Sequence, residues 1–492
     1  MSNLLLHQLL IRKGFPMTPA AQPPEPTAQA RASTLGELKQ HQYVRRGVRE
    51  ELRSNLLASM QSGKRWYEGI VGFEDTVIPA LENAILAGHD VILLGERGQA
   101  KTRIARTLSR LLDDEVPIVA GSELNDDPLH PISAFGRSIV AEQGDDTPVE
   151  WLPRDRRYAE KLATPDTTIA DLIGEVDPIK VAEGRYLSDE QALSFGLIPR
   201  TNRGIFNLNE LPDLAERIQV GLLNILEERD VQIRGFQVRL PLDLMVVASA
   251  NPEDYTNRGR IITPLKDRFG SQIRTHYPLT TELELAVVDQ EQQRIDIPNV
   301  DIRVPQYMRA IVAELSHVAR RSPDVSQRSG VSVRMSIANM EAMQANAVRR
   351  SIRLNESVAV PRMSDLRALL PASLGKLEFE TFGEVNDDRL FARLLAEASK
   401  LVFNQMIDWT ELDLLLLAFD NGLRVEASAM APSYTYIHQV SNIEGVSDAL
   451  SRLGVGREPA ELASGIEFLL EGLHVIRKLS RSESDSGVSY RR

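Results

Sequence analysis

The chain has 492 residues, with 57 Lys and Arg against 69 Asp and Glu, a formal net charge of −12 and a pI near 5.4. This acidic balance argues against broad binding to nucleic acid or to anionic membranes. The chain has no cysteine, which excludes disulfides and thiolate metal sites. No apolar run approaches the ~18 residues that a membrane span needs. We therefore expect a cytoplasmic protein without a membrane span.

The N-terminal residues differ in composition from the rest of the chain. Residues 15–34 are rich in proline, alanine and glutamine, which is typical of disorder. We predict a flexible leader over residues 1–40, in which Met17 is an alternative start to Met1. Residues 41–66 are polar and arginine-rich, and are predicted to form an N-terminal helical segment.

Residues 90–102 read Asp-Val-Ile-Leu-Leu-Gly-Glu-Arg-Gly-Gln-Ala-Lys-Thr. An apolar strand, a glycine-containing turn and a helical pattern follow one another, which is the context of a phosphate-binding P-loop. Lys101 would place a positive charge at the β- and γ-phosphates, and Thr102 would offer a hydroxyl to Mg²⁺. Ala100 stands where the GxxxxGKS/T pattern has its last glycine. The alternative is a strand-to-helix turn that binds nothing.

A second predicted strand, beginning at residue 204, ends in Asn209-Glu210. P-loop NTPases need an acidic group on a neighbouring strand, and Glu210 could act there as a general base. Most families have Asp where Asn209 stands. Its amide oxygen could assist Mg²⁺ with less electrostatic attraction, so weaker Mg²⁺ binding or slower turnover is expected. The alternative is a strand that ends in Asn-Glu without a function.

Three later polar residues complete the pattern. Asn251 ends the apolar run 244–250 and could hold an attacking water. Arg268 closes a helical segment before the last strand, where it could reach the nucleotide of a neighbouring subunit. Arg334 opens a helix in the second half and could contact a γ-phosphate from a lid. Each residue alone could have a turn or surface role, but their order along the chain favours a shared nucleotide site.

Strand and helix patterns alternate over residues 67–280, which indicates a parallel α/β sheet. From residue 281 onward, apolar residues recur at helical spacing. The candidate strands are 90–94, 116–120, 205–208, 244–250 and 271–275. The predicted parts are an α/β ATPase core (67–280), an all-helical lid (281–375), a C-terminal helical extension (376–480) and a flexible tail (481–492).

Over about residues 66–345, these motifs resemble the AAA+ ATPases, and in particular the branch of magnesium chelatase I subunits and MoxR-type ATPases. Ile70-Val-Gly72 resembles the adenine-side segment of this family, and an alanine before the P-loop lysine is a known variant in MoxR-type members. The segments 171–174, 184–185 and 196–198 resemble the helix-2 insert of this clade. Residues 230–240 suit the β-hairpin that precedes the asparagine strand.

The resemblance implies a P-loop AAA+ core with a parallel five-stranded sheet, which binds ATP and Mg²⁺. The implied catalytic residues are Glu210, Asn251 and Arg268, and the implied metal ligands are Thr102 and Asn209. The implied nucleotide-binding residues are Ile70, Val71, Gly95, Gly98, Gln99, Ala100, Lys101, Thr102 and Arg334.

The resemblance also implies how the protein works. We expect a homo-oligomeric ring, a hexamer, that hydrolyses ATP to ADP and phosphate. The ring would act with a separate protein that carries a von Willebrand factor A domain. Its output would be the remodelling of a client protein, or the loading of a cofactor or metal into it.

Two other function classes stay open. A nucleic-acid motor is favoured by Arg229, Arg234 and Arg239 on the predicted hairpin, since such hairpins can bind phosphates, and is opposed by the acidic pI. A nucleotide-gated scaffold with very slow turnover is suggested by Asn209.

Overall fold

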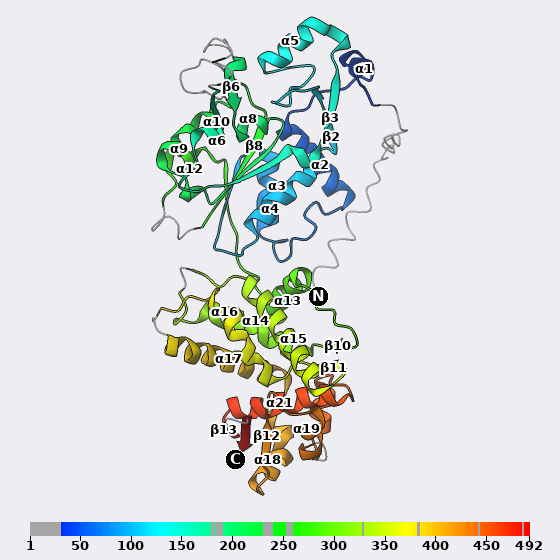
Figure 1. Ribbon diagram of the computed structural model, residues 1–492, viewed down its shortest axis with the longest axis vertical. Helices are drawn as coiled ribbons and strands as arrows, with labels where there is room; N and C mark the ends of the chain where they lie inside the picture. The colour runs from blue at the N-terminus through cyan, green and yellow to red at the C-terminus, as the bar shows by residue number, and fades with distance from the viewer. Residues whose placement is uncertain are drawn as a thin grey trace, which may run out of the picture.

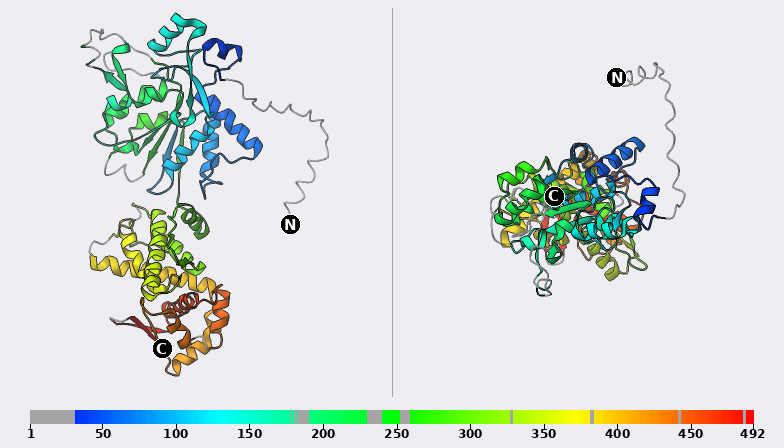
Figure 2. Two further views of the ribbon diagram at one scale, coloured as in Figure 1. Left: turned by 45° about the vertical axis from the view of Figure 1, so that its right-hand side comes forward. Right: turned by 90° about the horizontal axis from the view of Figure 1, so that it is seen from above.

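The computed structural model describes residues 31–492, apart from 178, 180–181, 183–189, 230–239, 252–258, 327–328, 381–383, 441–442 and 485–486. The predicted hairpin, except residue 240, and residues 184–185 of the predicted insert lie outside the described residues. The molecule is elongated, with an α/β body at one end and a mainly helical body at the other (Figure 1 and Figure 2).

The α/β body is built on a five-stranded sheet of order β4-β7-β8-β1-β9, in which all neighbouring strands are parallel. These strands are Tyr158–Leu162 (β4), Gly204–Asn209 (β7), Leu244–Ala250 (β8), Val91–Leu94 (β1) and Ser271–Arg274 (β9). Every residue of β8 is buried, as expected for an apolar strand covered on both faces. The prediction of a parallel five-stranded sheet is confirmed.

The prediction was wrong about one strand of this sheet. The run predicted at 116–120 forms Glu115–Val119 (β2), which pairs antiparallel with Val149–Pro153 (β3) in a separate two-stranded sheet. The edge position is taken by β4, whose residues are only partly buried or exposed. The sequence of β4, Tyr-Ala-Glu-Lys-Leu, lacks the continuous apolar run that indicated β1 and β8.

Helices cover the two faces of the sheet. Alternate residues of β1 belong to different cores, with Val91 and Leu93 on one side and Ile92 on the other, as the period of a strand requires. The core around Val91 contains Val48–Ser62 (α2), Val77–Ala87 (α3) and Lys101–Thr107 (α4). The core around Ile92 contains Ile169–Leu172 (α6), Leu197–Arg200 (α8), Glu216–Gly221 (α9), Leu223–Glu227 (α10) and Thr263–Arg268 (α12). This body also contains Ala134–Gln143 (α5) and the antiparallel pair Gly174–Val176 (β5) and Leu193–Phe195 (β6).

The second body contains one hydrophobic core that runs from Leu285 to Tyr490, so the predicted lid and the predicted extension share it. In the part of the chain that the structure describes, no helix combines the length and the apolar character needed to cross a membrane. The helices of this body are Thr281–Glu291 (α13), Gln306–Arg321 (α14), Arg334–Leu354 (α15), Leu369–Leu374 (α16), Glu384–Met406 (α17), Asp413–Asp420 (α18), Ser433–Val440 (α19), Val446–Arg452 (α20) and Pro459–Val475 (α21).

An all-helical second body was predicted, but this body also contains strands. The flexible tail predicted for the last residues is replaced by a strand pair. Ser480–Ser484 (β13) pairs with Gly487–Arg491 (β14), which also pairs with Val425–Ala427 (β12). Tyr490 anchors β14, because it is buried and its hydroxyl donates to Glu471 at 2.5 Å. A short parallel pair, Asp301–Ile302 (β10) and Val358–Ala359 (β11), lies in the predicted lid.

Residues 31–40 are ordered, whereas a flexible leader was predicted there. Trp151 Nε1 donates to the carbonyl of Ala32 at 2.9 Å, and helix α1 (Leu35–Gln40) buries Leu35 and Leu38. Two leucines three positions apart share one face of a helix. This face packs against the α/β body, an arrangement that the local composition does not predict.

A buried ion pair ties α2 to the sheet. Arg157 donates to the carboxylate of Glu51 at 2.7 and 2.6 Å, and also to the carbonyl of Arg203 at 2.8 Å. The two charged side chains are 1% and 3% exposed. Removing one partner of such a pair leaves the other charge buried and uncompensated.

We therefore predict that Arg157→Met lowers the stability of the α/β body by about 3–5 kcal/mol. Urea unfolding of the variant and the wild type would measure the difference. The matched control is Glu216→Gln, because Glu216 pairs with Arg260 at the surface, where both side chains are more than half exposed. The control should lose less than about 1 kcal/mol. Equal losses in the two variants would contradict the prediction.

Candidate functional site

The predicted P-loop lies at the carboxyl edge of the sheet and connects β1 to α4. The backbone N–H of Gly95 donates to the carbonyl of Ala250 at 3.1 Å, which holds the start of the loop beside the end of β8. Because β8 neighbours both β1 and β7, the ends of three strands meet here. Polar residues that follow these strands are thereby brought together.

The backbone of the loop needs two unusual conformations. Gly98 has φ 78°, and a Cβ built on it would lie 2.0 Å from Ser332 Oγ of the helical body. Ala100 also adopts the left-handed region, with φ 55°, which costs a non-glycine residue about 1–2 kcal/mol. The position where the pattern usually has glycine thus keeps a glycine-like conformation.

Lys101, Asn251 and Glu210 form a continuous chain of hydrogen bonds. Lys101 is buried, and its Nζ donates to the carbonyls of Gly95 and Glu96 at 2.5 and 2.9 Å and to Asn251 Oδ1 at 2.5 Å. Asn251 Nδ2 in turn donates to Glu210 Oε2 at 2.8 Å. The structure therefore brings together three predicted site residues that come from three segments of the chain.

Thr102 and Asn209 form a second group of hydrogen bonds at the P-loop. Thr102 Oγ1 donates to Asn209 Oδ1 at 3.4 Å, and Ser249 Oγ donates to the same oxygen at 3.2 Å. Ser249 was missed at the sequence level, although a hydroxyl inside an otherwise apolar strand is a usable signal. Its oxygen also accepts from the backbone N–H of Glu210 at 3.3 Å.

Glu210 has a strained backbone, with φ 55° and ψ 49°. Non-glycine residues in the left-handed region cost free energy, and such outliers cluster at functional sites. The strain sits on the acidic residue that the sequence analysis selected as a general base.

A pocket beside the P-loop lies between the two bodies. Its walls include Ile70 and Val71, which were predicted to bind the nucleotide, and Val333 of the helical body. Gln290 of α13 closes one side, where its Nε2 donates to the carbonyl of Gly69 at 3.0 Å. An apolar slot with a few polar groups next to a phosphate-binding loop suits a planar base. The pocket is lined by Gly69, Ile70, Val71, Gly72, Phe73, Gly98, Gln99, Ala100, Arg103, His276, Pro278, Val287, Gln290 and Val333.

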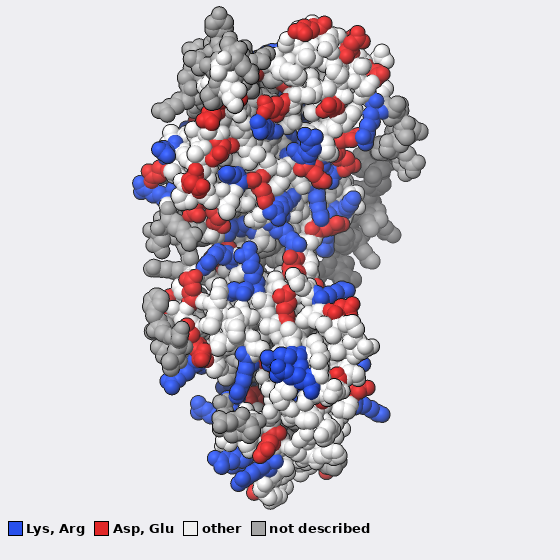
Figure 3. Space-filling view, viewed as in Figure 1, with Lys and Arg blue, Asp and Glu red and all other residues white. Residues whose placement is uncertain are grey.

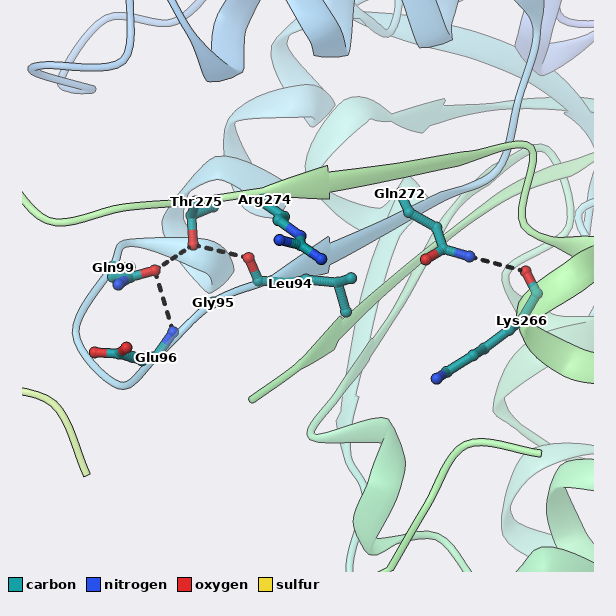
Figure 4. A pocket seen from close by; sticks show the side chains of 8 residues that line it. All are labelled: Leu94, Gly95, Glu96, Gln99, Lys266, Gln272, Arg274 and Thr275. Carbon is teal, nitrogen blue, oxygen red and sulfur yellow. Dashed lines mark hydrogen bonds between the residues drawn. The ribbon is translucent and has the colours of Figure 1, made fainter. Parts of the chain in front are cut away.

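A second cavity opens on the β9 side of the loop, and Figure 4 shows its lining. Gln99 Oε1 accepts from Thr275 Oγ1 at 2.8 Å and from the backbone N–H of Glu96 at 3.1 Å. Thr275 Oγ1 also donates to the carbonyl of Leu94 at 3.3 Å. These bonds fix the P-loop against β9, so the Gln99 side chain is engaged in shaping the loop.

The two predicted arginines lie apart from this cluster. Arg268 ends α12, where its Nε donates to Glu227 at 2.8 Å and its Nη1 to the carbonyl of Pro264 at 2.8 Å. Arg334 is exposed at the start of α15, and its guanidinium forms no hydrogen bond or ion pair with any described residue. The structure of one chain therefore does not bring either arginine together with Lys101.

The P-loop tip is also tied to the helical body. Arg97 pairs with Glu378 at 2.8 Å, and Tyr277 OH donates to the Arg97 carbonyl at 2.9 Å. On the face drawn in Figure 3, charges of both signs are interspersed over both bodies. These contacts connect the P-loop directly to residues outside the α/β body.

Arg229, which favoured a nucleic-acid motor, has a partner inside the chain. It pairs with Asp90, which is buried at the start of β1 and also pairs with Arg49. Burial raises the pKa of Asp90 to about 6, although Arg49 opposes this. Arg234 and Arg239, the other two residues of that argument, lie outside the described part of the chain.

One known protein family matches part of the chain. The family described as AAA domain (dynein-related subfamily) matches residues 149–269. Among curated proteins, YeaC of Bacillus subtilis (strain 168), an uncharacterized protein, is 27% identical over 157 residues, which are 28% of this chain and 48% of that protein. The match thus spans about half of the relative's length.

Two solved structures align with much of the chain at low TM-scores. A chain from the complex of the BchI and BchD subunits of magnesium chelatase is 21% identical, covers 66% of this chain and 98% of its own, and has a TM-score of 0.35. A putative ATPase from Cytophaga hutchinsonii is 17% identical, covers 73% and 98%, and has a TM-score of 0.29. TM-scores of this size support no functional argument.

Proposed function

Because residues 149–269 match the AAA domain family, and the motifs of the chain resemble the magnesium chelatase and MoxR branch of AAA+ ATPases, we propose that it works as an ATP-hydrolysing ring motor. The ring, a hexamer, remodels a client protein or loads a cofactor or metal into it. The observation that carries the proposal is the convergence of Lys101, Thr102, Asn209, Glu210 and Asn251 at the ends of β1, β7 and β8.

ATP binding uses the P-loop and the pocket next to it. Lys101, held at the loop by two carbonyls, exchanges these partners for β- and γ-phosphate oxygens. Ile70 and Val71 offer apolar contact to the adenine, and Val333 closes the pocket from the helical body. Gly98 allows the close approach between the loop and Ser332.

The site fits Mg²⁺ as a partner of the nucleotide. The hydroxyl of Thr102 and the amide oxygen of Asn209 lie 3.4 Å apart, and such hard oxygens are what Mg²⁺ prefers. A neutral amide attracts the ion less than a carboxylate would, so binding depends on the phosphates as well. When bound beside Thr102 and Asn209, Mg²⁺ would supply positive charge that offsets the negative charge developing during phosphoryl transfer.

Hydrolysis uses the pair Glu210 and Asn251. Glu210 accepts a proton from the attacking water, and Asn251, which donates to Glu210 at 2.8 Å, holds the carboxylate and the water in line. Arg268 comes from the neighbouring subunit and stabilises the transition state. Arg334, exposed at the start of α15, contacts the γ-phosphate when the helical body closes.

The remaining parts of the proposal concern assembly. Hydrolysis depends on the ring, because the neighbouring subunit completes the site. Movement of the helical body then transmits the energy of hydrolysis to the client. A separate protein with a von Willebrand factor A domain is the proposed partner of the ring. The internal pairing of Arg229 with Asp90 removes one support for a nucleic-acid motor.

The test measures phosphate release and assembly mass together, with Mg·ATP, for the wild type and Asn209→Asp. We expect the wild type to hydrolyse ATP as a ring, and the variant to turn over severalfold faster at limiting Mg²⁺, because a carboxylate attracts the ion more strongly than an amide. A wild-type ring that binds ATP without releasing phosphate, together with an active variant, would identify a nucleotide-gated scaffold instead. No ATP binding by either chain would refute the proposal.

A further inference from the structure

A polar residue lies inside the strand that carries Asn209. Asn207 in β7 is fully buried, with 0% exposure. Its Nδ2 donates to Tyr158 OH at 2.9 Å and to Asn209 Oδ1 at 3.2 Å. Its Oδ1 has no hydrogen-bond partner among the described residues. An unpaired buried amide oxygen costs free energy, and an apolar residue would suit this position in the strand better.

The register of the sheet places these side chains on one face. Glu160 of β4 lies opposite Asn207 of β7, and Tyr158 lies opposite Ile205. Because side chains alternate along a strand, residues two apart share a face. Tyr158, Glu160, Asn207 and Asn209 therefore line the same face of the β4–β7 pair.

Glu160 fixes which of these side chains donate hydrogen bonds and which accept them. Arg106 of α4 donates to its carboxylate, with Nε at 2.9 Å, and this hydrogen bond holds the pKa of Glu160 below its usual range. An ionised carboxylate only accepts hydrogen bonds. The Tyr158 hydroxyl therefore donates a hydrogen bond to Glu160 Oε2 at 3.2 Å. The hydroxyl oxygen of Tyr158 accepts a hydrogen bond from the Asn207 amide.

Asn207 then decides the orientation of Asn209. The oxygen and nitrogen of an asparagine amide are nearly equal in size, so the hydrogen-bond partners determine which way the amide is turned. The hydroxyls of Thr102 and Ser249 can donate or accept, whereas the Asn207 NH₂ only donates. Asn209 must therefore turn its oxygen toward Asn207, and the same oxygen faces Thr102. A carboxylate at position 209 would need no such orientation, since both of its oxygens accept hydrogen bonds.

We propose that Tyr158 and Asn207 are positioning residues that keep the amide oxygen of Asn209, and not its amide nitrogen, at the Mg²⁺ side of the P-loop. The two asparagines of β7 are thus coupled, with Asn207 compensating for the amide at 209. A reversed Asn209 would present N–H groups to the cation. The inference rests on the proposed function, because it assigns the role of the metal ligand to Asn209.

The test is a double-mutant cycle that reads binding instead of turnover. Calorimetry with a non-hydrolysable ATP analogue, titrated over a range of Mg²⁺ concentrations, gives the apparent Mg²⁺ affinity of each chain. We expect Tyr158→Phe to weaken this affinity about tenfold, the usual size for a residue that orients a metal ligand. In the Asn209→Asp background, the same substitution should change it less than about twofold.

Two further variants sharpen the test. Asn207→Leu removes the donor itself and should repeat the result of Tyr158→Phe in both backgrounds. Tyr490→Phe is the matched control, because it also removes a tyrosine–glutamate hydrogen bond, from the C-terminal sheet, and it should leave Mg²⁺ affinity unchanged.

The possible failures are distinguishable. Equal losses in the wild-type and Asn209→Asp backgrounds would overturn the inference, because they would show a general structural effect. No loss in either background would also overturn it, while the proposed function would stand. If the wild-type chain binds no nucleotide at any Mg²⁺ concentration, the proposed function and the inference both fail.

Discussion

Replacing Glu210 with glutamine is expected to lower ATP turnover about 100-fold or more, while ATP binding persists. Glutamine keeps the shape of the side chain and can still meet the Asn251 amide, which now donates to Glu210 at 2.8 Å. It cannot accept a proton from water as a carboxylate does. Lys101, Thr102 and the pocket around Ile70 are left unchanged, so the variant should hold ATP without cleaving it.

Phosphate release, ATP affinity and assembly mass, measured together, would check this result. We expect the variant to accumulate as an ATP-bound ring, since the step that releases the γ-phosphate is blocked. Glu314→Gln is a suitable control, because it removes a carboxylate that pairs with Arg321 in the helical body. It should keep wild-type turnover. Wild-type turnover in Glu210→Gln would show that another group activates the water.

The three central strands of the sheet were the clearest in the sequence, because they are buried along most of their length. β1 and β8 are apolar, and β7 is largely so, because helices cover the sheet on both faces, so each was visible as a short apolar run. β4 was missed because its sequence, Tyr-Ala-Glu-Lys-Leu, contains no apolar run. β2 was assigned to the wrong sheet, since an apolar run gives no information about which strand it pairs with.

The termini were mispredicted for a related physical reason. Leu35 and Leu38 sit in a polar segment, and Tyr490 follows a run of serine and arginine, so composition favoured disorder in both places. Each segment is ordered by a few contacts with residues far away in the chain, such as Trp151 for the first and Glu471 for the second. Contacts of this kind are not visible in local sequence.

The sequence predicted the principal residues of the site, and the structure added residues that hydrogen-bond to them. The family match over residues 149–269 supports the AAA+ prediction, and the predicted residues Lys101, Asn251 and Glu210 are joined by hydrogen bonds. Ser249 and Asn207 were missed, because their partners are set by strand register. The roles of all these residues, including Arg268, stay predictions.

Arg268→Ala is expected to lower ATP turnover about 1,000-fold or more, without loss of ATP binding. Within its own chain, Arg268 donates to Glu227 and to the Pro264 carbonyl, and no described contact joins it to the P-loop. The proposed function assigns its charge to the transition state in a neighbouring subunit. Arg321→Ala removes an exposed, ion-paired arginine from the helical body and serves as the control, which should keep most of the activity.

Mixing two inactive variants would decide whether Arg268 acts between subunits. Lys101→Ala should fail to bind ATP but still present Arg268, whereas Arg268→Ala should bind ATP but lack the arginine. If Arg268 acts on its neighbour, mixed rings contain some complete sites, because a Lys101→Ala subunit supplies its arginine to an ATP-bound Arg268→Ala subunit. Phosphate release should then rise well above that of either variant alone. If the arginine acts within its own subunit, no mixed ring contains a complete site and the mixture stays inactive.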